Sequence, residues 1–258
     1  MDLASNNSIL TLALATARLI GMFVFSPVFG ETVLPAKLRA MIALVLALGL
    51  WGMIAQPAAL PQTGLAMILA LSGELLIGLA IGYAARLIFV GVELGAFHIS
   101  QQMGLSLGEV FNPMTDETSE AVRDLFRILA LVIFLAVGGH RLLLGALADS
   151  FANVPIMGFL NPQVMIASLA GLLGSVFLLA IKVAAPVLAA MLLAGLAIGF
   201  IQRTIPQINI LSTGMPVRVM LGLVLIVSVL AVGIMPNLIG WASDELGRQL
   251  RTLTGGLR

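Results

Sequence analysis

The chain has 258 residues, of which 60% are hydrophobic and only 10% charged, whereas roughly a quarter of an ordinary soluble domain is charged. A mean hydropathy of +1.12 is typical of a membrane protein. The 13 basic and 12 acidic residues leave no basic field to hold nucleic acid. The absence of cysteine excludes disulfides, thiolate metal sites and cysteine nucleophiles.

Charge-poor apolar stretches of about 20 residues predict helices long enough to span a membrane. The first stretch lacks a basic leading region and a small-residue cleavage site, so we expect a retained helix and not a signal peptide. No strand-like alternation is present, so the predicted class is all-α: a polytopic membrane-type protein of helical hairpins with six or seven apolar helices. In chain order the stretches are 8–29, 40–56, 64–89, 128–148, 164–181, 183–202 and 219–243, the last being the clearest.

The membrane topology implied by these stretches is in conflict with itself. Basic residues favour the cytoplasmic side, which would place both the turn at Lys37 and Arg39 and the linker 203–218 there. The turn and the linker can both lie on the cytoplasmic side only if 164–202 crosses the membrane once. A helix of this length is too long for one crossing, since each residue adds about 1.5 Å. A broken helix, a re-entrant pair or hairpins shielded by partner proteins would each resolve the conflict.

Two linkers differ from the short neutral turns elsewhere and are where we expect function. The linker 109–124 is acidic and polar but has an apolar tip, formed by Val110, Phe111 and Met114. Inside a pore these side chains would block passage by sterics and dewetting. The alternative is an interfacial loop that dips its aromatic group into the headgroup layer.

The linker 203–218 is basic and contains two prolines and a glycine. Its polar side chains surround Pro206, which ends a helix. Gln207 and Asn209 both donate and accept hydrogen bonds. We therefore expect a turn bonded to a neighbouring helix or subunit.

Pairs of glycines four residues apart indicate close approach of helices in an apolar medium, although glycine abundance alone produces some such pairs. Polar residues within or beside the apolar stretches are expected to face a partner helix, a cavity or water. The glycine pairs are Gly78/Gly82, Gly91/Gly95, Gly104/Gly108 and Gly195/Gly199. The polar residues are Glu74, Arg86, Glu93, His98, Gln101, Gln102, Lys182 and the adjacent His140 and Arg141.

Catalytic and metal chemistry are weakly indicated. The segment around Ser106 fits the GxSxG pattern of hydrolases, but that chemistry needs a strand-to-helix turn and a histidine after the acid. Here the preceding stretch is predicted to be helical, and His140 precedes Asp149. We therefore interpret Ser106 as a small residue at a helix contact. The two histidines are far apart and lack a ligand motif, so no metal site is predicted.

A set of residues in and around the two linkers occurs in a recognisable order and spacing. These residues are Gln102 to Ser106 including Gly104, then Asn112 and Pro113, Gly139 and His140, 149–155, Arg203, Pro206, Gln207, Asn209, Gly214, Met215 and Pro216. With them the chain resembles the FliR family of flagellar type III export gate proteins, called SctT in injectisomes, and the similarity covers essentially the whole chain.

The resemblance implies one FliR-like domain over 1–258, with a FliP-like and a FliQ-like part meeting near residue 160. It implies a single copy among about five FliP-like and about four FliQ-like subunits in a helical complex, with a FlhB-like subunit, membrane lipid and passing flagellar proteins as further partners. Such an assembly at the inner membrane would lift helices out of the bilayer and use the glycine pairs for subunit packing. No nucleic acid, cofactor or enzymatic activity is implied.

The same resemblance assigns residue roles. The region matching 106–118 is expected to plug the closed channel, which agrees with the pore interpretation of Val110, Phe111 and Met114. The other matching residues in the two linkers are expected to make structural or subunit contacts. An injectisome subunit, a secondary transporter and an intramembrane hydrolase are the alternatives; a transporter predicts a two-fold internal repeat, and the sequence shows no convincing one.

Overall fold

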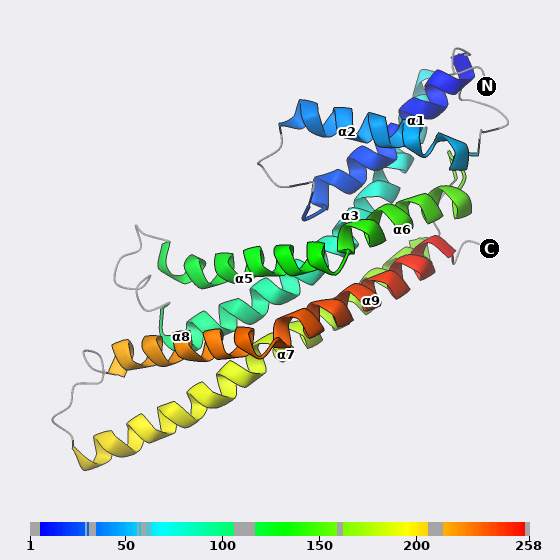
Figure 1. Ribbon diagram of the computed structural model, residues 1–258. Coiled ribbons are helices and arrows are strands. Elements are labelled where there is room, and N and C mark those ends of the chain that lie inside the picture. Colours follow the sequence, from blue (N-terminus) through cyan, green and yellow to red (C-terminus); the bar gives the residue numbers. More distant parts are fainter. Residues whose placement is uncertain are drawn as a thin grey trace. The chain divides into compact units, whose positions relative to one another are not determined.

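The computed structural model describes residues 6–28, 30, 35–55, 57, 61, 63–105, 117–158, 162–205 and 214–255. Over these ranges the chain forms eight α-helices and one 3-10 helix, with no β-strand (Figure 1), which confirms the all-α class. The elements are α1 (Asn6–Phe25), α2 (Ala36–Gly49), η1 (Trp51–Met53), α3 (Gly64–Met103), α5 (Glu117–Ala136), α6 (Gly139–Asn153), α7 (Pro162–Thr204), α8 (Met215–Ala231) and α9 (Ile234–Gly255).

Helix α7 is continuous where the sequence predicted two helices. It runs for 43 residues through Lys182 and Pro186, which corresponds to about 65 Å, roughly twice the hydrocarbon thickness of a bilayer. Proline removes one backbone hydrogen bond, but Val183, Ala184 and Val187 are buried on either side and hold the helix together. A broken helix and a re-entrant pair are therefore wrong for 164–202, while shielding by partner proteins stays a prediction.

The opposite difference occurs at two predicted single helices, 128–148 and 219–243. Each is divided by a sharp bend, at Gly138 and at Gly233. These glycines have φ of 86° and 74°, a left-handed conformation that an α-helix does not continue through and that glycine adopts without strain. By length and composition, three helices are suited to span a membrane, or up to five if each bent pair counts as one span, within the described residues.

The chain divides into two compact units. Unit 1 comprises 1–87, 138–174 and 243–258, and unit 2 comprises 88–137 and 175–242, so α3, α7 and α9 contribute to both. Nothing in this division tests the FliP-like and FliQ-like parts, which remain a prediction.

Each unit has its own apolar core, built from helices with buried residues every three or four positions. In unit 1, α1 buries Leu14, Leu19, Met22 and Phe23, and α6 buries Leu143, Leu147 and Phe151. In unit 2, α5 buries Val122, Phe126, Ala130 and Phe134, and the Phe134 ring meets that of Phe89 on α3 edge to face, with 5.4 Å between centroids.

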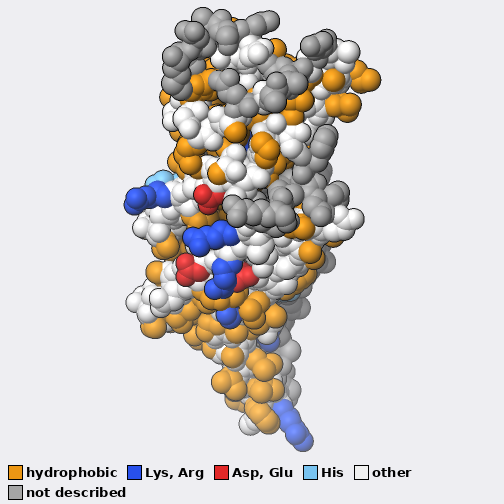
Figure 2. Space-filling model, turned by 90° about the vertical axis from the view of Figure 1, so that its right-hand side faces the viewer, with side chains coloured by type: hydrophobic (Ala, Val, Ile, Leu, Met, Phe, Trp, Pro, Cys, Tyr) orange, Lys and Arg blue, Asp and Glu red, His pale blue; other side chains and the backbone are white. Residues whose placement is uncertain are grey.

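Large apolar side chains also cover much of the surface. Figure 2 shows hydrophobic side chains widespread over one face of the molecule. Leu65 in unit 1, and Phe200 and Met220 in unit 2, are each about 70% exposed. Surfaces of this kind mark contact with lipid or with other proteins, so each unit presents apolar faces that are not satisfied within the chain.

Candidate functional site

A buried ion pair lies at the centre of unit 1. Arg18 on α1 is completely buried and Glu74 on α3 is 1% exposed, with the Arg18 Nε donating to Glu74 Oε2 at 2.6 Å. Isolated charges in an apolar interior are strongly unfavourable, and such groups persist only when they are paired and hydrogen-bonded. The pair therefore joins α1 to α3 across 56 positions of sequence.

The remaining Arg18 donors bind the end of α6. Nη1 donates to the Ser150 carbonyl at 3.0 Å, and both terminal nitrogens donate to the Val154 carbonyl at 3.2 Å. The guanidinium also lies 4.4 Å from the centroid of the Phe151 ring. The last carbonyls of a helix lack partners within it and carry partial negative charge, so Arg18 acts as the cap of α6.

Glu74 in turn holds the turn that follows α6. Its second carboxylate oxygen accepts a hydrogen bond from the Met157 backbone N–H at 2.8 Å. Met157 has φ of 68°, which is uncommon for a residue with a side chain and persists where surrounding contacts impose it. We call Arg18, Glu74, Ser150, Phe151 and Met157 the Arg18 centre.

The sequence predicted that Glu74 faces a partner helix, a cavity or water, and it did not identify Arg18 as the group that Glu74 meets. Arg18 interrupts the first apolar stretch, and no motif or spacing in the sequence singles it out further. The available signal was that two apolar helices each carried an ionisable residue, of opposite charge. Several other apolar stretches also carry an ionisable residue, so the spacing along the sequence does not show which of them pairs with Glu74.

Close backbone contact between α1 and α3 positions the Arg18 centre. A side-chain carbon at Gly78 would overlap the Arg18 carbonyl oxygen, and one at Gly82 would overlap that of Met22. Gly78 lies one turn beyond Glu74 on α3. The pair Gly78/Gly82 therefore packs within the chain, and its expected role in subunit packing is wrong.

In unit 2, the pair Gly91/Gly95 brings α3 against α7. A side-chain carbon at Gly91 would lie 3.0 Å from the Val176 carbonyl oxygen, and one at Gly95 would lie 2.9 Å from that of Ala180. This pair is also a contact within the chain. At Gly199, by contrast, a side-chain carbon would meet nothing within 4 Å, so subunit packing at Gly195/Gly199 stays a prediction.

Gly104 ends α3 at the entrance to the acidic linker. It has φ of 84°; its N–H donates to the Gln101 carbonyl at 3.0 Å, and the Leu105 N–H donates to that of Ser100 at 3.2 Å. These bonds satisfy carbonyls at the helix end, in the way glycine caps commonly do. Gly104 is therefore a helix terminator, and Gly108, its partner in the predicted glycine pair, lies outside the described residues.

The predicted plug and five of the ten candidate assembly-contact residues lie outside the described residues. Gln102 is half-buried in the last turn of α3. Outside the described residues lie Val110, Phe111 and Met114, and with them Ser106, Asn112, Pro113, Pro206, Gln207 and Asn209.

The described ends of the basic linker are Arg203 and Gly214. Arg203 is exposed in the last turn of α7, where its charge suits the negative helix end. Gly214 immediately precedes α8, and Pro216 is exposed in the first turn of that helix, a position where proline leaves no internal hydrogen bond unmade.

Two other polar groups singled out from the sequence lie on unit 2. Lys182 is half-buried, and its ammonium is 3.9 Å from the centroid of the Trp241 ring, a distance at which a cation is attracted to an aromatic face. His98 is exposed on α3. Across the described residues, no three histidine or acidic side chains gather as metal ligands would.

The family described as "Bacterial export proteins, family 1" matches residues 9–242. The "Flagellar biosynthetic protein FliR" of Bacillus subtilis is 30% identical over 218 residues, which are 83% of this chain and 84% of the relative. The protein of that name from Caulobacter vibrioides is 31% identical over 83% and 86% of the two chains. The "Yop proteins translocation protein T" of Yersinia pestis is 28% identical over 81% and 82%.

Proposed function

Because this chain belongs to family 1 of the bacterial export proteins, we propose that it is a component of the flagellar type III export gate. The observation that carries the proposal is the match itself, which runs over 9–242 and so covers all of unit 2 and most of unit 1. Relatives named as flagellar biosynthetic proteins align over more than four-fifths of the chain. The proposal is therefore for the whole chain.

In finer detail, the subunit assembles with FliP-like and FliQ-like subunits, about five and about four of them, and with a FlhB-like subunit at the inner membrane. Heterologous contacts that do not close produce a helical array. The exposed apolar faces of both units support this, since they require lipid or other subunits to cover them. Helix α7 exceeds a bilayer's hydrocarbon thickness, which supports an assembly that shields helices outside the membrane.

The role we assign to the chain is that of scaffold and gate, without chemistry of its own. Val110, Phe111 and Met114 form the plug of the closed channel. They lie in sequence between the end of α3, set by Gly104, and the start of α5 at Glu117. Gln102, Gly104, Asn112 and Pro113 in the first linker make assembly contacts, as do Arg203, Pro206, Gln207, Asn209, Gly214 and Pro216 in the second.

An injectisome subunit is the second candidate, and the similarity to the Yersinia pestis translocation protein favours it. The two candidates differ in the cargo that passes the gate. Deleting the gene and measuring swimming together with hook and filament protein in the medium separates them.

Loss of swimming and of flagellar secretion, restored by the gene in trans, is the expected result. Normal swimming with normal flagellar secretion would contradict the flagellar role. A strain that lacks the filament gene alone is the control, because it loses swimming but still secretes hook protein.

A further inference from the structure

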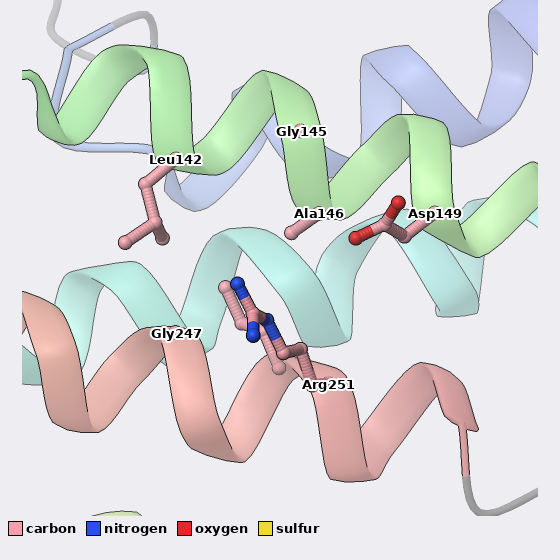
Figure 3. A pocket seen from close by; sticks show the side chains of 7 residues that line it. Leu142, Gly145, Ala146, Asp149, Gly247 and Arg251 are labelled. Atoms are coloured by element: carbon pink, nitrogen blue, oxygen red, sulfur yellow. The ribbon is translucent and has the colours of Figure 1, made fainter.

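A pocket lies between α6 and α9 within unit 1, separate from the Arg18 centre. It has a volume of about 160 Å³ and is open between the two helices (Figure 3). Its walls are Leu142, Gly145, Ala146 and Asp149 from α6, with Gly247, Leu250 and Arg251 from α9.

Two opposite charges face this pocket without neutralising each other. Figure 3 shows the Asp149 carboxylate and the Arg251 guanidinium projecting from the two helices into the space between them. Both residues are exposed. Among the described residues, no ion pair joins Asp149 and Arg251 or joins either of them to a third side chain. The nearby Arg248, in contrast, is bonded to Glu245 on its own helix.

The rest of the pocket is small or apolar. A side-chain carbon at Gly145 would meet nothing within 4 Å, whereas one at Gly247 would lie 3.3 Å from the Leu142 side chain. Leu250, which precedes Arg251 on α9 and also lines the pocket, is 1% exposed. The two charges thus stand at the mouth of a hollow whose walls offer no competing hydrogen-bonding side chain.

We propose that this pocket binds the headgroup of a zwitterionic phospholipid of the phosphatidylethanolamine class. A planar guanidinium binds phosphate through two parallel hydrogen bonds, and a carboxylate accepts hydrogen bonds from a primary ammonium. Such a headgroup supplies both complementary charges in one molecule. The inference depends on the membrane-type helices of the chain and not on its export role.

The position of the pocket along α9 favours lipid over a protein helix. Residues 234–243 of α9 carry no charge, whereas from Asp244 onward the helix carries charges at Asp244, Glu245, Arg248 and Arg251. Headgroups lie where an apolar helix becomes charged. A helix laid over the pocket would desolvate both charges, which is unfavourable unless it carried two matching partners.

The test uses the full chain, purified in detergent with its co-expressed subunits and stripped of lipid. Phosphatidylethanolamine, phosphatidylglycerol and phosphatidylcholine are added at equal concentration, and the bound lipid is counted by native mass spectrometry. Phosphatidylethanolamine is expected to bind best, because phosphatidylglycerol lacks the ammonium and the methylated ammonium of phosphatidylcholine donates no hydrogen bond to Asp149.

Two charge variants separate the two halves of the headgroup. Arg251→Gln is expected to weaken phosphatidylethanolamine binding about tenfold, the loss typical of one charge-assisted hydrogen bond. Asp149→Asn is expected to remove the preference over phosphatidylglycerol while leaving phosphate binding in place. Arg248→Gln is the matched control on the same helix. It is expected to change neither the strength of phosphatidylethanolamine binding nor the preference over phosphatidylglycerol.

A filling variant gives a readout that does not depend on charge. Gly145→Leu projects into the pocket and is expected to displace the lipid, while Gly174→Leu, which also meets open space, is not. Equal binding of the three lipids by the unaltered protein, which needs no variant to fold, would overturn the proposal.

A protein occupant would show itself differently. Loss of a co-purifying subunit in Asp149→Asn and Arg251→Gln, with lipid binding unchanged, would overturn the proposal in favour of a protein contact. Flagellar secretion by the same variants is measured separately. If the protein shows no preference among the three lipids but flagellar secretion is normal, the lipid proposal is wrong and the export function is unaffected. If the protein prefers phosphatidylethanolamine but its gene is not needed for secretion, the export function is wrong and the lipid proposal is unaffected.

Discussion

Units 1 and 2 bury polar side chains to very different extents. Among the described residues, Ser100 is the buried polar side chain of unit 2, whereas unit 1 buries two charged residues, Arg18 and Glu74, and six hydroxyl residues: Ser8, Thr11, Ser26, Ser150, Ser168 and Ser243. Unit 2 is packed through the close approach of α3 and α7 at Gly91/Gly95 and the Phe89–Phe134 contact, whereas unit 1 combines its buried polar groups with a glycine contact at Gly78/Gly82.

The difference teaches that two packing strategies coexist in one apolar chain. A buried ion pair demands its partner, because removing one member leaves a desolvated charge behind. Shape-based packing loses only the contacts that are removed. We therefore expect unit 1 to depend on a few irreplaceable groups and unit 2 to be more tolerant.

The largest effect is expected at the ion pair. Glu74→Ala leaves Arg18 buried without a counter-charge and releases the Met157 turn, which is expected to lower the free energy of unfolding by about 3–5 kcal/mol. Stability is measured by denaturant unfolding of the purified protein in detergent micelles.

The double variant Arg18→Met with Glu74→Met is the control for that prediction. Replacing both charges with apolar groups removes the unpaired charge, so it is expected to recover more than half of the lost stability. If the double variant is less stable than Glu74→Ala, the ion pair does not explain the effect.

The next effect compares helix contacts in the two units. The added carbon in Gly78→Ala overlaps the Arg18 carbonyl, so this variant is expected to lower the free energy of unfolding by about 1–3 kcal/mol, as overpacking does. Gly91→Ala is expected to cost less, because its carbon would lie 3.0 Å from the nearest backbone oxygen. Gly73→Ala, which meets nothing within 4 Å, is the control. If Gly78→Ala and Gly91→Ala lower the free energy of unfolding equally, the two helix contacts do not differ in how tightly they are packed.

A smaller effect is expected at the end of α3. Gly104→Ala keeps the helix but forces a side chain into the left-handed conformation, with an expected cost of about 1 kcal/mol. Amide hydrogen exchange at position 104 and at Leu105 should accelerate, because these two N–H groups donate to the Gln101 and Ser100 carbonyls and both bonds weaken. Gly199→Ala, in a helix and facing open space, is the control; unchanged exchange in Gly104→Ala would contradict a capping role.

The smallest effect on stability, within about 0.5 kcal/mol, is expected from Phe111→Gly with Met114→Gly. If these side chains plug the channel, the double variant leaks ions through the assembled gate while folding normally. Conductance is measured in lipid bilayers with the unaltered assembly as reference. Unchanged conductance would refute the plug assignment and favour the interfacial-loop alternative.

The sequence by itself determined the all-α class, the apolar helices and the presence of close glycine contacts, because these follow from local composition and periodicity. It also included Glu74 among the polar residues expected to face a partner helix, a cavity or water. The family resemblance was readable for the same reason, since it depends on residue identities in order along the chain.

Which side chains and helices contact one another was decided only by the tertiary structure. Nothing local distinguishes Arg18 from the other basic residues as the group that neutralises Glu74, since the choice depends on how α1, α3 and α6 pack. The bends at Gly138 and Gly233, and the continuity of α7 through Pro186, were likewise decided by packing. Hydropathy measures how much apolar surface a segment has, and it carries no information on which neighbour covers that surface.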